Sequence, residues 1–221
     1  MNSKTTLLRR LKSLERRADA SESGSPAFED PFWPLAVFGD PTRAQALYFV
    51  TKPALPRLVG TSAKGEQCLF LTRHGIPSQA TLKTAEWISR MLDLHVCFIG
   101  DLNAQDLAAF MTFDAFLKKR RRKLLYAGVS DPWITLGRSS LKTHMVMDSL
   151  FVPQSSIDRE RWQLTKRLYP QLKTLIGREG TSLLDRGLSL AQEAVCNRAF
   201  FRRGYKERVT ALLLSQGRLA D

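Results

Sequence analysis

Three short apolar runs, each followed by turn residues and then a helical pattern, place the strongest constraint on the fold. The runs are RAQALYFV, which ends at Val50, then Gln67–Thr72, and then LHVCFIG, which Gly100 closes. Strands that are apolar throughout are buried on both sides, and strands that alternate with helices pair in parallel. The sequence therefore predicts an α/β fold: a parallel sheet, Rossmannoid in type, with helices on both faces.

The helical segments follow from apolar periodicity and from helix-start signals. Pro77 and Ser78 open a helix that continues through Met91, and a second helix runs from Ala104 through Phe116. Further periodic stretches predict helices over 158–169, 181–203 and 206–214. The prediction is a single α/β domain over residues 42–221 with a helical C-terminal part.

Two segments are expected to precede this domain. Residues 1–20 place leucines on one face of a helix and cations on the other, which predicts a basic amphipathic helix. Residues 21–41 are rich in Ser, Pro and acidic side chains, which is typical of a linker.

Charge points to the class of partner. The chain has 34 Lys and Arg against 21 Asp and Glu, a net charge of +13. A strongly basic protein favours a polyanion, with nucleic acid first and an acidic membrane surface second. Six consecutive cations end the second helix, and we interpret them as a phosphate-binding patch, with a solvated helix end as the alternative. They are Lys118, Lys119, Arg120, Arg121, Arg122 and Lys123.

Cysteine usage and hydropathy bear on the compartment. The three cysteines form no CxxC pair and lie in apolar surroundings, which predicts buried thiols in a reducing compartment. No apolar run approaches the roughly 18 residues of a membrane span. We therefore expect an intracellular, cytoplasmic protein, or a nuclear one if the source is eukaryotic.

Polar residues follow each predicted strand at the edge where such sheets place their functional groups. Lys52 follows the first strand, Arg73 follows the second, and the stretch CFIGDLNAQDLAAF ends the third with Asp101. Asn103 stands two residues beyond Asp101. Asp106 falls in the first turn of the next helix, where it is either a ligand or a helix-start residue.

The tryptophans divide into two groups. Trp87 and Trp162 lie in periodic helical patterns, and we interpret them as core or packing residues. Trp33 and Trp133 lie beside prolines, where they are candidates for stacking on bases, although burial against the domain is the favoured interpretation.

Three pieces of the chain together resemble the Toprim domain of topoisomerase VI A subunits and of Wadjet-type plasmid-defence nucleases. They are LYFVTKPALPRLVG, LTRHGIPSQATLKTAEWI and VCFIGDLNAQDLAAF, and the resemblance covers about residues 44–116. In that family, a Glu after the first strand and two carboxylates after the third hold magnesium. The matching positions here are Thr51, Asp101 and Asn103, which makes a poor magnesium site because two of three charged ligands are replaced.

The resemblance and the charge lead to three hypotheses. The first is a degenerate, non-catalytic Toprim-like protein without a cofactor, which binds DNA or a nucleic-acid-processing partner through Lys52, Arg73 and Lys118–Lys123. The second is a nuclease that uses Mg²⁺ or Mn²⁺ with Asp101, Asn103 and Asp106, in which Asp101 is the metal ligand. The third is an interaction scaffold whose N-terminal helix binds a protein partner.

Overall fold

A computed structural model of the chain describes residues 36–60, 65–73 and 77–218. The predicted amphipathic helix over 1–20 lies outside these residues, as does most of the predicted linker. Among the described residues, no helix is both long enough and apolar enough to cross a membrane.

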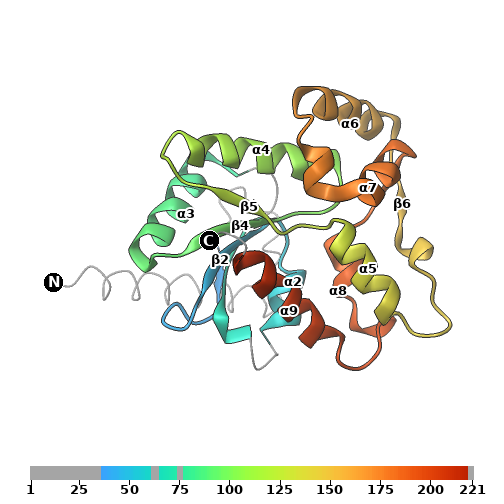
Figure 1. The fold of residues 1–221 in the computed structure, drawn as a ribbon, viewed down its shortest axis with the longest axis horizontal. Coiled ribbons are helices and arrows are strands. Elements are labelled where there is room, and N and C mark those ends of the chain that lie inside the picture. The colour runs from blue at the N-terminus through green and yellow to red at the C-terminus, as the bar shows by residue number, and fades with distance from the viewer. Residues whose placement is uncertain (1–35, 61–64, 74–76, 219–221) are drawn as a thin grey trace, which may run out of the picture.

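The core of the fold is a five-stranded, mostly parallel sheet (Figure 1). Its strand order is β1-β3-β2-β4-β5. The strands are β1 (Ala36–Phe38), β2 (Ala46–Val50), β3 (Cys68–Thr72), β4 (His95–Ile99) and β5 (Leu124–Tyr126). Strands β3, β2, β4 and β5 are parallel neighbours, whereas β1 pairs antiparallel with β3. The predicted α/β class and the three predicted parallel strands are confirmed.

Strand β1 extends the sheet into the segment that composition had marked as a linker. Val37 is buried and lies opposite Leu71 of β3. The boundary predicted at residue 42 is therefore too late, because a strand of three residues among prolines gives no periodic signal.

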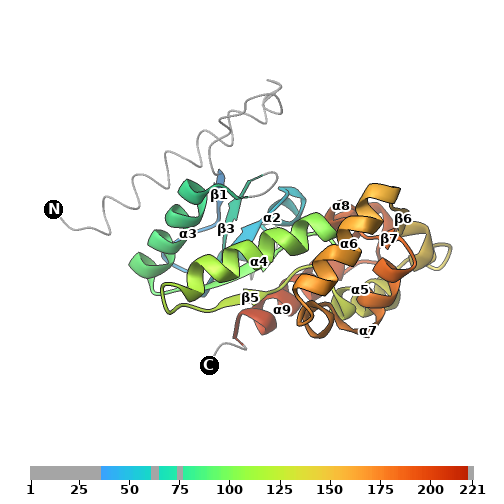
Figure 2. The same cartoon turned by 90° about the horizontal axis from the view of Figure 1, so that it is seen from above.

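Helices connect the parallel strands and form the C-terminal part. They are α2 (Ala54–Val59), α3 (Gln79–Leu92), α4 (Ala104–Lys118), α5 (Asp131–Ser140), α6 (Ser156–Leu168), α7 (Leu172–Asp185), α8 (Gln192–Cys196) and α9 (Tyr205–Arg218). Three 3₁₀ turns, η1 (Gly65–Gln67), η2 (Met147–Leu150) and η3 (Arg198–Phe200), and a small antiparallel pair, β6 (Val152–Pro153) with β7 (Leu188–Ser189), complete the described elements. Helices α5 to α8 gather at one end of the sheet, as both views show (Figure 2).

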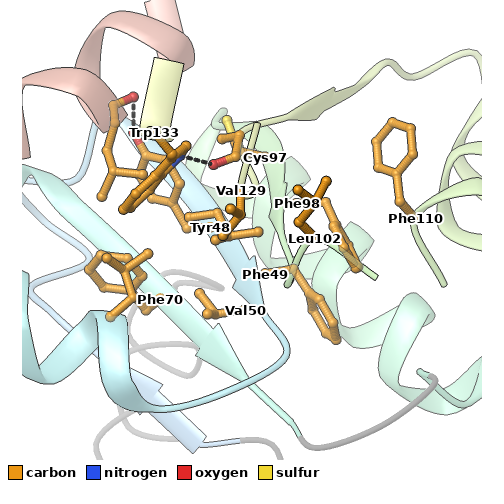
Figure 3. Close-up of a cluster of buried hydrophobic side chains, with 14 of the residues drawn as sticks. Tyr48, Phe49, Val50, Phe70, Cys97, Phe98, Leu102, Phe110, Val129 and Trp133 are labelled. Carbon is orange, nitrogen blue, oxygen red and sulfur yellow. Dashed lines mark hydrogen bonds between the residues drawn. The ribbon is translucent and has the colours of Figure 1, made fainter. Parts of the chain in front are cut away.

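The centre of the sheet is filled by apolar and aromatic side chains (Figure 3). The Tyr48 hydroxyl donates a hydrogen bond to the Leu213 carbonyl of α9, at 2.9 Å. The next residue, Phe49, meets Phe113 of α4 edge to face, with ring centroids 5.4 Å apart. Both side chains are fully buried, so β2 is covered by protein along its length. All three cysteines are buried and free, as predicted.

The long helix predicted over 181–203 does not form. Helix α7 ends at Asp185, and Gly187 then adopts a φ of 74°, which favours glycine and closes the helix. The chain continues through β7 and a bridge between Leu190 and Leu102 into the short helix α8. As a result, residues 190–193 lie beside the end of β4.

Candidate functional site

The candidate site lies where the strand order reverses. After β2 the chain adds β3 on one side and then returns to add β4 on the other side of β2. In open α/β sheets, such a reversal leaves a crevice at the carboxyl ends of the two strands, where ligands commonly bind. Thr51 and Lys52 follow β2, and Gly100 and Asp101 follow β4, so these residues meet at this position.

Asp106 of α4 holds the ends of β2 and β4 together. Its Oδ2 accepts a hydrogen bond from the Thr51 hydroxyl at 2.8 Å and another from the Asp101 backbone N–H at 2.7 Å. Gly100 allows this approach, because a Cβ at that position would lie 2.8 Å from the Asp106 Cβ. From the sequence, Gly100 was expected only to end the strand, and its close contact with Asp106 was not predicted.

Asp101 is a buried carboxylate whose two oxygens both have partners. Its Oδ1 accepts the Gln192 backbone N–H at 2.8 Å, and its Oδ2 lies 2.7 Å from the Lys52 Nζ. Lys52 also reaches Glu193 of α8, 2.8 Å from Oε2. The Lys52 ammonium therefore lies between two carboxylates and offsets part of their negative charge.

The surroundings shift two pKa values. Burial, followed by the charge of Asp101, raises the pKa of Asp106 to about 6, although the hydrogen bonds from Asp101 and Thr51 oppose this change. Partial burial on its own would lower the pKa of Lys52, but hydrogen bonds and charges from Asp101 and Glu193 outweigh it and raise that pKa. Lys52 therefore remains a cation throughout the physiological range.

Asn103 has a structural role at the start of α4. Its side-chain oxygen accepts the Asp106 backbone N–H at 2.8 Å, and its backbone is extended, as an N-cap requires. Asparagine is among the best N-cap residues, whereas the family resemblance placed a metal ligand here.

Gln192 completes the cluster from the C-terminal part of the chain. It is 1% exposed, and its side-chain NH₂ group donates to the Thr51 hydroxyl at 3.0 Å. Gln192 and Glu193 were not predicted as site residues, because their apolar neighbours predicted one long helix over 181–203. Gly187, five residues before Gln192, is the helix-stop signal that could have separated them from α7.

The residues present do not fit a magnesium ion. Magnesium requires several oxygen ligands, with carboxylates supplying most of the charge. Both oxygens of Asp101 already have a partner, Lys52 or the Gln192 N–H, and the Asn103 side-chain oxygen caps α4. Gln192 Oε1 is buried without a hydrogen-bond donor among the described residues, but it is a neutral amide oxygen. Over the same residues, no group of three or more His, Cys, Asp and Glu side chains could hold a metal.

Arg73 lies at the end of the neighbouring strand but turns away from this cluster. Its guanidinium hydrogen bonds the Ser78 hydroxyl at 2.9 Å and also the Thr81 hydroxyl. Ser78 is the N-cap of α3 and Thr81 lies in its first turn. Arg73 therefore stabilises the start of α3 in this structure.

The six cations of 118–123 lie at the opposite end of the sheet. Lys118, the last residue of α4, stands 12 positions after Asp106, which is about 18 Å along the helix at 1.5 Å per residue. The turn then meets the amino ends of the strands, since Arg122 donates to the Leu94 carbonyl at 3.2 Å, just before β4. The structure thus separates two groups of predicted site residues that the sequence could not place relative to each other.

Within this turn, bound and unbound cations alternate. Lys118 pairs with Asp114, Arg120 lies 3.1 Å from Glu86 of α3, and Arg122 holds Leu94. The side chains between them are exposed, and within the described part of the chain they have no ion-pair or hydrogen-bond partner; they are Lys119, Arg121 and Lys123. The first set fixes the turn on the protein, and the second set is available to a ligand.

A scan against protein-family models found no match to this chain, and a search of curated proteins also found none.

Proposed function

We propose that this protein is a non-catalytic, Toprim-like α/β protein that binds DNA through the turn at Lys118–Lys123. The observation that carries the proposal is that Lys119, Arg121 and Lys123 are exposed and have no partner among the described residues, while the cations between them hold the turn on the protein. Clustered Lys and Arg neutralise phosphates and release counterions, which gives affinity without base recognition. The net charge of +13 adds a long-range attraction for the same ligand.

The Toprim-like assignment rests on the order of the motifs and on where they meet. The segments that resemble the family follow one another along β2, β3 and β4, and two of them end at the switch point. We further infer a sheet with helices on both faces. Successive residues of a strand point to opposite faces, and Tyr48 contacts α9 whereas Phe49 contacts α4.

The lack of catalysis in this proposal rests on Lys52. Its ammonium occupies the position beside Asp101 where a metal-dependent enzyme of this kind needs a divalent cation. A nuclease using Asp101, Asn103 and Asp106 would first have to break the Lys52–Asp101 pair and the α4 cap. No contact of the described residues favours that alternative, and the scaffold hypothesis depends on an N-terminal helix outside them.

The test is duplex DNA binding as a function of salt. The triple variant K119A/R121A/K123A has a net charge of 13 − 3 = +10. The control K173A/R178A/R186A removes the same charge from exposed positions on α7 and just after it. We expect a steep fall of affinity with salt for the wild type. The slope of log K against log[salt] should shrink by about 2 to 3 in the turn variant, because each phosphate contact contributes about 0.9.

The control variant should keep a slope within about one unit of the wild type, since its lost charges act only at long range. Equal changes in the two variants would show that net charge alone governs binding, and the turn would then have no special role. Lack of binding by the wild type at low salt would overturn the proposal.

A further inference from the structure

Helix α6 carries apolar side chains that the rest of the described protein leaves exposed. The helix packs on α4 and α7, and it buries Trp162 and Thr165. Its other large apolar side chains, Ile157, Leu164 and Leu168, are 59%, 53% and 61% exposed. Figure 1 shows α6 at the outer edge of the helices that gather at one end of the sheet. Several exposed apolar side chains on one helix are typical of a surface that binds another protein.

The spacing of these side chains places them in one line along the helix. Ile157, Leu164 and Leu168 stand at intervals of seven and four residues, and Arg161 divides the first interval into four and three. Residues three and four apart are neighbours on a helix surface, and alternating intervals of four and three form the contact line of a two-stranded coiled coil. We call these four residues the α6 seam.

Two charged residues beside the seam complement each other only if a second helix is present. Glu160 and Arg167 are exposed, and neither forms an ion pair with a described residue; the Arg167 Nε donates only to the Gln163 carbonyl, at 3.3 Å. Together with Leu164 they line a shallow hollow on this side of α6. Their seven-residue spacing separates them by about 10 Å along the axis, so they do not meet within one helix. An antiparallel second helix would bring the Arg167 of one copy beside the Glu160 of the other.

We propose that the α6 seam binds the α6 seam of a second copy of this chain, with the two helices antiparallel. Such a pair is related by a two-fold axis and repeats each contact twice. Ile157 then faces Leu168 of the second copy, and Leu164 faces Arg161, whose alkyl stem covers it. The Arg161 charge is partly offset by Asp158, which lies 3.3 Å away in the same helix.

The predicted dimer is weak, because each copy contributes only three large apolar side chains. Interfaces at the small end of the size range typically give transient complexes. The Glu160–Arg167 contacts select the antiparallel orientation and add little affinity, since exposed ion pairs are weak. This inference concerns a surface that the proposed DNA binding does not use, and it stands or falls independently of that proposal.

The experiment is sedimentation equilibrium of the full chain at protein concentrations from about 10 to about 300 µM, a range suited to weak association. A salt concentration of about 0.15 M gives a Debye length of about 8 Å, which screens the repulsion between two chains of charge +13. We expect the apparent mass to rise with concentration from 25.0 kDa toward twice that value. It should rise no further, because a two-fold interface closes at the dimer.

The central position of the seam gives the first test. L164K places a lysine against Arg161 of the second copy and should weaken dimerisation at least about tenfold. The matched control is V146K, which adds the same charge at a 66% exposed apolar residue outside α6. It should change the dimerisation constant by less than about twofold.

A charge exchange tests the orientation. E160K and R167E each place like charges together at both symmetric contacts, and each should weaken dimerisation about three- to tenfold. The double variant E160K/R167E has the wild-type net charge and restores opposite charges in the exchanged order. It should return dimerisation to within about twofold of the wild type, because in the antiparallel pair the two changes compensate.

Thermal melting of each variant establishes that it is folded. A wild type that remains monomeric at about 300 µM would overturn the inference and leave the α6 seam to a different protein. Equal weakening by L164K and V146K would also overturn it, since net charge alone would then govern association. If the double variant is as weak as E160K or R167E, the antiparallel pairing is wrong.

Discussion

The two ends of the sheet balance their charges in opposite ways. At the carboxyl end, Lys52 lies 2.7 Å from Asp101 and 2.8 Å from Glu193, so its charge is satisfied within the protein. At the amino end, Lys119, Arg121 and Lys123 are exposed and have no partner in the described part of the chain. The difference teaches that a position favoured by sheet topology is not by itself a sufficient guide to where a ligand binds. The position favoured by the topology is filled, whereas the exposed cations begin about 18 Å from Asp106 along α4.

Removing the Asp101 side chain should give the largest loss of stability, and the contacts it breaks all lie at the carboxyl end of the sheet. D101A leaves the buried Gln192 N–H without its acceptor and the half-buried Lys52 without its nearer carboxylate. We expect a loss of about 3 kcal/mol in the free energy of unfolding, measured by urea denaturation.

The matched control is D148A, which removes an exposed carboxylate of η2 and should change stability by less than about 0.5 kcal/mol. K119A/R121A/K123A should also be as stable as the wild type, because these side chains hold no part of the fold. A stable D101A variant would mean that the Lys52–Asp101 pair does not support the junction of β2 and β4.

Ionisation of Asp106 should change the free energy of unfolding by a smaller amount, and this amount depends on pH. Its pKa is about 6 in the folded protein against 3.8 as the reference value for an unperturbed Asp. The folded state therefore binds this proton more tightly than the unfolded chain does, so this residue's contribution to stability falls as pH rises from about 4 to about 6.5. The expected decline over that range is about 2 kcal/mol.

D106N isolates this contribution because it cannot titrate, while its amide oxygen can still accept from Thr51 and the Asp101 N–H. The stability of the wild type minus that of D106N, from urea denaturation at several pH values, should decrease from pH 4 to 6.5. A difference that is flat, or that increases with pH, would contradict the raised pKa.

The parts of this molecule that the sequence predicted are those fixed by local chemistry. The apolar runs of β2, β3 and β4 identify buried parallel strands, and Ser78 marks the start of α3 through its cap. Asp101 was placed correctly at the edge of the sheet, because parallel strands bring their ends together. These features depend on residues close together in the chain.

The parts that the sequence missed depend on distant contacts. Gln192 hydrogen bonds Thr51, which stands 141 positions earlier in the chain, and no residue near Gln192 in the sequence indicates that contact. Lys52 was predicted only as a nucleic-acid-binding residue, because its ion pair with Glu193 joins residues 141 positions apart in the chain. Trp87 was predicted to be a core or packing residue from its helical pattern, but it is 37% exposed, because the packing of α3 and not the local pattern decides its burial.

The most direct test of the central claim, that Lys52 and not a metal balances Asp101, is a manganese titration followed by electron paramagnetic resonance. Added to the wild-type protein near neutral pH, Mn²⁺ should keep the full signal of the free ion at micromolar to submillimolar concentrations, because Asp101 is already paired. The account would be contradicted by a stoichiometric loss of that signal in the wild type that D101A abolishes and D148A leaves intact.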